Sequence, residues 1–183
     1  GPRTKLFAFT AISNALGTVN PVQELVKIGK SAGAKVLVDA CQWAPHRPMD
    51  LRAWGADFAA FSAHKMLGPT GIGVLWGREE LLEAMDPFLG GGDMISRVTL
   101  EGATWNELPY KFEAGTPNIA DAVAFGPALD YLSAAGLSAV WAHGDGLAAK
   151  AVKILEAEPG GRVLGPRDPA RRSSVVSFNI QGL

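Results

Sequence analysis

The sequence predicts an α/β domain with a mostly parallel sheet flanked by helices. Nearly continuous apolar runs occupy residues 36–39, 58–61 and 72–76, as expected for strands buried on both faces. Helical spacing of apolar residues appears between and after such runs, which favours alternating strands and helices. Asp39 and Ser62 each end a run, and ligands bind at the carboxyl ends of parallel strands.

The first elements follow from local patterns. Residues 6–10 are apolar and β-compatible and lead into a polar turn at Ser13-Asn14, which predicts a strand and then a turn. Apolar residues recur at helical spacing over 22–28, with Pro21 at the start and Gly33 near the end. We expect a helix of about three turns there.

The later elements divide the chain. Residues 87–115 contain Gly90-Gly91-Gly92 and scattered aromatic residues, which predicts a long functional loop. Two Ala-rich helices are expected over 119–132 and 137–155, joined around Gly136, and two strands over 162–164 and 175–178. We predict that residues 1–135 are part of a large domain and that residues 136–183 begin a smaller α+β domain. Because the chain begins and ends on strand-like segments, we expect truncation at both ends.

Composition narrows the class of protein. The 183 residues carry 17 Lys and Arg against 18 Asp and Glu, so a net charge of −1 gives no reason to expect nucleic acid or an anionic membrane as partner. The single cysteine, Cys41, excludes an internal disulfide framework and is compatible with a reducing compartment, so we expect a cytoplasmic protein. No stretch approaches the ~20 apolar residues of a membrane span, and the first residues lack the apolar segment of a signal peptide.

The segment Ser62-Ala63-His64-Lys65 lies between the run 58–61 and the turn Gly68-Pro69-Thr70-Gly71. A lysine amine forms a Schiff base with an aldehyde cofactor when it is partly desolvated, and a strand end opening into a Gly-rich loop provides that setting. The sequence therefore predicts Lys65 as the covalent anchor of pyridoxal phosphate. The alternative for Lys65 is a solvated surface lysine.

Other polar residues fit the same cofactor. Asp39 would pair with a pyridinium nitrogen, although a strand-end or capping carboxylate is the alternative. Gln42 would reach the phenolic oxygen, with a helix-surface amide as its alternative. Ser62 and His64 are suitable phosphate donors on a turn, and His64 could instead be a satisfied core histidine.

We predict no catalytic or ligand-binding role for His46, His143 or Cys41. His46 and His143 are expected to be packed or partly exposed imidazoles, and histidines scattered in this way do not favour a metal site. Cys41 lies inside an Asp-x-x-Gln turn, where a small space-filling role is expected rather than that of a nucleophile.

Six motifs occur in a fixed order along nearly the whole chain. They are Ser13-Asn14-x-x-Gly17-Thr18-x-Asn20-Pro21, Val38-Asp39-x-x-Gln42-x-x-Pro45-His46, Asp57-Phe58-x-x-Phe61-Ser62-x-His64-Lys65, Gly68-Pro69-Thr70-Gly71-Ile72-Gly73, Gly90-Gly91-Gly92-x-Met94-Ile95 and Phe112-Glu113-Ala114-Gly115-Thr116-Pro117-Asn118. Together they resemble cysteine desulfurases of the SufS type, which are pyridoxal-phosphate enzymes of the class V aminotransferase family with fold type I. The triple glycine followed by Met94-Ile95 favours the SufS-like branch.

The resemblance implies a role for each matching residue. Lys65 would anchor the cofactor and then act as general acid and base at the substrate α-carbon. Asp39, Gln42, Ser62 and His64 would bind the ring nitrogen, the phenolic oxygen and the phosphate, as their residue types also indicate.

The resemblance also implies partners. Thr116 would reach the phosphate of the cofactor in a neighbouring subunit, which implies a homodimer, and Asn14 would lie near the substrate. L-Cysteine would be converted to L-alanine, and its sulfur would pass as a persulfide to an acceptor protein for iron–sulfur cluster assembly.

Some of the family's residues have no counterpart in this sequence. The nucleophilic cysteine and substrate-binding arginine belong to a segment after Leu183, and the phosphate-binding threonine and ring-stacking histidine to a segment before Gly1. We therefore expect the chain alone to be inactive and to bind the cofactor weakly or not at all. Alternatives are a selenocysteine lyase, another class V lyase or aminotransferase, a non-catalytic truncated paralogue acting as a scaffold, or an unrelated α/β domain.

Overall fold

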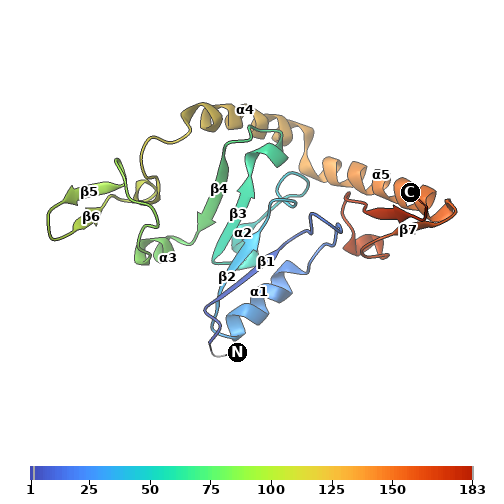
Figure 1. Cartoon of the computed structure of the whole chain (residues 1–183), viewed down its shortest axis with the longest axis horizontal. Coiled ribbons are helices and arrows are strands. Elements are labelled where there is room, and N and C mark those ends of the chain that lie inside the picture. Colours follow the sequence, from blue (N-terminus) through green and yellow to red (C-terminus); the bar gives the residue numbers. More distant parts are fainter. Residues whose placement is uncertain (2, 183) are drawn as a thin grey trace.

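A four-stranded sheet forms the centre of the computed structural model, which describes residue 1 and residues 3–182 (Figure 1). Its strands are β1 (Leu6–Thr10), β2 (Lys35–Asp39), β3 (Phe58–Ser62) and β4 (Gly73–Gly77), in that order across the sheet. The first three are parallel to one another, and β4 runs antiparallel to β3. The predicted α/β class with a mostly parallel sheet is confirmed.

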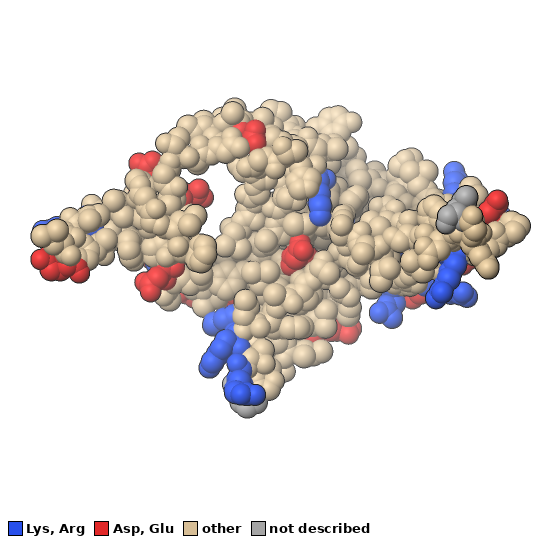
Figure 2. All heavy atoms as spheres, viewed as in Figure 1, with Lys and Arg blue, Asp and Glu red and all other residues tan. Residues whose placement is uncertain are grey.

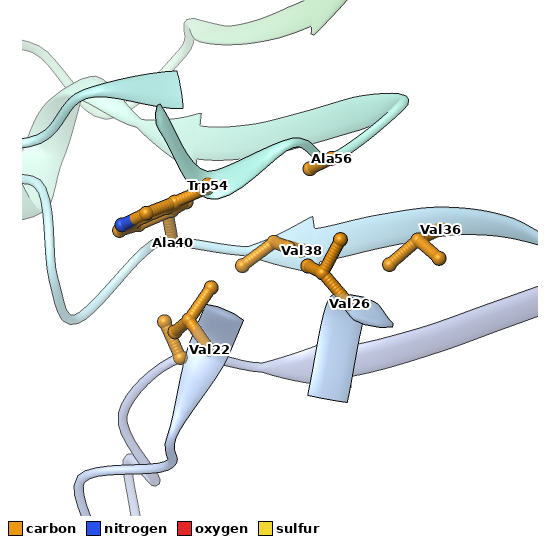
Figure 3. Packing of buried hydrophobic residues seen from close by; sticks show 8 residues of the cluster. Val22, Val26, Val36, Val38, Ala40, Trp54 and Ala56 are labelled. Atoms are coloured by element: carbon orange, nitrogen blue, oxygen red, sulfur yellow. The ribbon is translucent and has the colours of Figure 1, made fainter. Parts of the chain in front are cut away.

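The sheet is covered by α1 (Val22–Ser31), which packs against β2. Val22 and Val26 of the helix lie against Val36 and Val38 of the strand in one buried cluster (Figure 3). The helix begins after Pro21 and is followed by Gly33, whose φ of +73° is accessible to glycine without strain. The predicted three-turn helix is confirmed.

The remaining helices are α2 (Leu51–Trp54), α3 (Glu79–Ala84), α4 (Ile119–Ala135) and α5 (Leu137–Ala157). Gly136 joins α4 to α5 at a bend of 74°, with a φ of +77°. Among the described residues, no single helix is long and apolar enough to cross a membrane. The predicted pair of helices around Gly136 is confirmed. The division into a large domain (1–135) and the start of a smaller one (136–183) stays a prediction, and its last residue, Leu183, lies outside the described residues.

Two small hairpins lie at opposite ends of the molecule (Figure 1). One consists of β5 (Ile95–Val98) and β6 (Ala103–Trp105), followed by a 3-10 helix η2 (Tyr110–Phe112), and the other of β7 (Gly161–Val163) and β8 (Phe178–Ile180). The predicted long loop over 87–115 is therefore wrong in part, because β-compatible residues on both sides of the turn at 99–102 pair with each other. The last strand begins at Phe178 rather than at residue 175.

Burial on both faces holds for β2 but not for β4. Val36 and Val38 are fully buried, whereas Val74 and Leu75 are 38% and 56% exposed. The expectation is wrong for β4 because this strand forms an edge of the described sheet and belongs to neither buried cluster. Charged side chains lie in small scattered groups on the face shown in Figure 2, as the near-zero net charge suggests.

Asp57 ties α1 to the amino-terminal ends of two strands. Its side chain is 3% exposed, bonds to Lys30 Nζ of α1, and accepts a hydrogen bond of 2.8 Å from the Val36 N–H of β2. Burial alone would raise the pKa of Asp57, but the bonds from Lys30 and Val36 outweigh it and lower the pKa. The carboxylate is thus held charged next to the first residue of β3.

We expect Asp57→Asn to lower the free energy of unfolding by about 1–2 kcal/mol at neutral pH, because the buried carboxylate loses its charge-assisted bond to the partly exposed Lys30. A lowered folded-state pKa stabilises the fold above the ordinary carboxyl pKa of about 4, and this contribution is lost as the pH falls through the folded-state value. The difference between the two proteins, measured by urea unfolding, should therefore shrink in acid. Asp86→Asn, at an exposed site, is the control, and an equal loss in that variant would contradict the assignment.

Candidate functional site

The carboxyl ends of the three parallel strands β1, β2 and β3 lie side by side at one end of the sheet, which we call the carboxyl edge. In the strand register, Thr10 of β1 lies opposite Asp39 of β2, and Asp39 lies opposite Ala60 of β3. Ser62, the last residue of β3, therefore lies near Asp39 at the same edge. The predicted position of the ligand site at this edge agrees with the register.

Lys65 follows this edge on a single 3-10 turn, η1 (Ala63–Met66). Ala63 and Met66 of the turn are buried against Phe125 of α4, and the Ala63 N–H donates to the Ile72 carbonyl at 3.1 Å. This packing leaves His64 exposed and Lys65 half-buried. The lysine is thus partly desolvated, as its predicted role requires.

Asp39 and Cys41 lie at the carboxyl end of β2, next to β3. The Asp39 carboxylate accepts a hydrogen bond of 2.9 Å from the Cys41 N–H. Burial and the Asp39 carboxylate raise the pKa of the Cys41 thiol, while the Ser62 hydroxyl and the Lys65 ammonium act in the opposite direction without outweighing them. The thiol therefore lies close to all three predicted cofactor residues and stays protonated at neutral pH.

The Ser62 hydroxyl oxygen is buried and makes no normal hydrogen bond within the described residues, although the Cys41 thiol, a weak hydrogen-bonding group, lies near it. Buried polar groups are nearly always bonded, and an unbonded one indicates a missing ligand or a functional role. Ser62 was predicted to bind the phosphate of pyridoxal phosphate. An unsatisfied hydroxyl beside a carboxylate and a half-buried lysine fits that cofactor.

Gln42 and Asn14, two of the predicted site residues, contact each other. The Gln42 side-chain amide donates to Asn14 Oδ1, so the predicted cofactor and substrate residues orient each other. His46 Nδ1 lies 2.9 Å from the Gln42 carbonyl oxygen, to which it donates. No role was predicted for His46, yet its bond stabilises the turn that carries Gln42.

The loop at Gly71 is fixed by the start of α4. The Gly71 N–H donates to Asp121 Oδ2 at 3.0 Å, and Asn118 Nδ2 donates to the Gly71 carbonyl at 3.3 Å. Asn118 also caps α4 by accepting from the Asp121 N–H. Sequence reasoning missed both residues, although Asn-x-x-Asp before an apolar helix is a capping signal.

Thr116 is exposed, two residues before the Asn118 cap. No hydrogen bond within the described residues joins Thr116 to Asp39, Ser62 or Lys65. Its predicted role toward a neighbouring subunit remains a prediction.

The model of the aminotransferase class V family matches residues 1–183, the whole chain. This chain belongs to the class V aminotransferase family.

Individual relatives of this class V chain are cysteine desulfurases. It is 49% identical over 97% of its length to a probable cysteine desulfurase of Streptomyces coelicolor, and 51% identical over 98% to one of Halobacterium salinarum. It spans 43% of the length of each relative.

Solved structures of cysteine desulfurases also match the fold of this chain. A cysteine desulfurase of Escherichia coli matches with a TM-score of 0.93 at 39% identity, covering 100% of this chain and 45% of the other. One of Thermococcus onnurineus matches with a TM-score of 0.90 at 41% identity, covering 98% of this chain and 45% of the other. The predicted family and fold are confirmed.

We expect Ser62→Ala to leave the free energy of unfolding unchanged or to raise it by up to about 1 kcal/mol, because alanine removes an unsatisfied buried hydroxyl. Urea unfolding measures the effect. Ser173→Ala is the control, since Ser173 is a buried serine whose hydroxyl accepts from the Val175 N–H at 3.3 Å. The control should lose about 1 kcal/mol, and a comparable loss in Ser62→Ala would show that its hydroxyl has a partner.

Proposed function

We propose that this chain carries the cofactor-anchoring part of a pyridoxal-phosphate-dependent cysteine desulfurase. The observation that carries the proposal is the unsatisfied, buried Ser62 hydroxyl next to Asp39 and the half-buried Lys65. Cysteine desulfurases at about half identity over almost the whole chain support the same activity.

The residues at the sheet edge fit the cofactor in distinct roles. Lys65 would hold it covalently, the Asp39 carboxylate would bind its ring nitrogen, and Ser62 and His64 would bind its phosphate. Gln42, oriented by Asn14, would bind its phenolic oxygen. When bound, pyridoxal phosphate supplies an electron sink that stabilises negative charge at the substrate α-carbon.

Lys65 is the group that moves protons. Lys65 lies on a short turn in which Ala63 and Met66 are buried. The backbone of Lys65 is therefore held in place, while its half-buried side chain remains accessible. A neutral amine there would take the proton from the substrate α-carbon and return a proton when L-alanine is formed. The Cys41 thiol, kept protonated by its raised pKa, does not compete with Lys65 as a base.

The partners are part of the proposal. L-Cysteine is the substrate and a sulfur-acceptor protein takes the persulfide, which serves iron–sulfur cluster assembly. The protein acts as a cytoplasmic homodimer in which the exposed Thr116 contacts the cofactor phosphate of the second subunit. The exposure of Thr116 supports this arrangement, since a residue serving another subunit must be reachable from outside.

Borohydride trapping tests the cofactor site. Because the chain alone is expected to bind the cofactor weakly at best, it is incubated with excess pyridoxal phosphate and then reduced. Peptide mass spectrometry should find the adduct on Lys65 in clear excess over the exposed Lys27 and Lys150, because Lys65 lies beside the groups that would hold the cofactor. Lys65→Ala should remove the main adduct and Ser62→Ala should weaken it. Labelling spread evenly over the lysines would contradict the site.

A chimera tests the activity. Residues 1–183 would replace the matching 45% of the Escherichia coli cysteine desulfurase. The chimera should release alanine from L-cysteine, and Lys65→Ala should lower the rate by about 10³-fold because the α-carbon loses its acid and base. A folded, cofactor-loaded chimera active only on L-selenocysteine would favour a selenocysteine lyase, and one inactive on both would contradict the proposal.

A further inference from the structure

Arg47 is enclosed by two tryptophans from different parts of the fold. Its guanidinium carbon lies 4.6 Å from the ring centroid of Trp43 and 4.0 Å from that of Trp141 on α5. Both distances are within the range of cation–π attraction, which is strongest for tryptophan. We name Trp43, Arg47 and Trp141 the arginine stack.

The arginine stack contacts the core on one side and lies near the half-buried carboxyl group of Asp145 on the other. Trp43 contacts the buried Trp54 edge to face, with ring centroids 5.1 Å apart, and donates from Nε1 to the Pro48 carbonyl at 3.1 Å. Asp145 lies one helical turn after Trp141, where burial raises its pKa against the opposing effects of Arg47 and Trp141. The stack therefore connects the core beside β2 to α5.

The turn that contains Trp43 and Arg47 also contains Gln42. Within this Gln42 turn, residues 40–47, the Ala44 N–H donates to the Ala40 carbonyl and the Arg47 N–H to the Trp43 carbonyl, both at 2.9 Å. His46 adds its bond to the Gln42 carbonyl. A short turn bonded in this way moves as one piece, so fixing Trp43 and Arg47 also fixes Gln42.

We propose that Arg47 is a positioning residue, whose stacking between Trp43 and Trp141 clamps the Gln42 turn to α5 and so holds Gln42 at the cofactor site. The part that concerns the cofactor rests on the function proposed above. Arg47 acts through the turn that carries Gln42, since its guanidinium lies against the rings of Trp43 and Trp141. The clamp joins the two predicted domains, since Arg47 precedes residue 136 and Trp141 follows it.

Hydrogen exchange tests the clamp without reference to the cofactor. In Arg47→Met, amide exchange in a peptide covering residues 40–48 should rise about fivefold, because the cation that joins the two indole rings is lost. Arg47→Lys keeps a cation and should restore most of the protection. Arg52→Met, at an exposed arginine on α2, is the matched control and should leave this peptide unchanged.

A double-variant comparison isolates the stack. If Arg47 acts through Trp141, then Arg47→Met combined with Trp141→Leu should exchange no faster than the faster single variant. Additive effects, or unchanged exchange in Arg47→Met, would overturn the clamp.

Trapping at Lys65 tests the link to the site. Arg47→Met should lower the borohydride adduct on Lys65 relative to the native chain, and Arg47→Lys should recover it. Faster exchange with an unchanged adduct would overturn the positioning role. Absence of the Lys65 adduct in the chimera with the Escherichia coli cysteine desulfurase would instead refute the proposed function, while the exchange data would still decide the clamp.

Discussion

The candidate site depends on the parallel register of β1, β2 and β3. Parallel strands place their carboxyl ends at one edge, and this register brings Asp39 beside Ser62 although 22 residues separate them along the chain. Asp57 supports the register at the opposite edge by binding Lys30 of α1 and the Val36 N–H of β2. A change of one residue in the pairing would turn Asp39 to the other face of the sheet. The chemistry at one edge is therefore maintained by an ion pair at the other.

Much of the fold could be predicted from local patterns. The runs at 36–39 and 58–61 are strands because β-compatible side chains pack against α1 and the second cluster. The hairpin at 95–105 was missed because its apolar residues are exposed, as Leu100 at its tip shows, so no burial pattern marks it. The antiparallel β4 was expected to be buried like its neighbours, since its composition does not reveal that it lies at an edge.

The candidate site, too, could be predicted from the sequence only in part. Asp39 and Ser62 were identified because each is the last residue of a parallel strand, and Lys65 because it lies on the turn directly after β3, where topology makes residue type informative. Asn118, Asp121 and Arg47 were missed because their roles depend on contacts between distant segments. Arg47 in particular meets Trp141 across 94 positions of sequence, and no local pattern indicates such a contact.

The neutral thiol of Cys41 has a consequence for the handling of sulfur. In a protein that releases a reactive sulfur atom, a thiolate beside the cofactor would be a second acceptor and would retain the sulfur. Burial and the Asp39 carboxylate keep this group protonated, and a protonated thiol is a poor nucleophile. In the proposed desulfurase, the same carboxylate that would bind the cofactor would thus also protect the route of the sulfur, by keeping Cys41, the single cysteine of this sequence, unreactive.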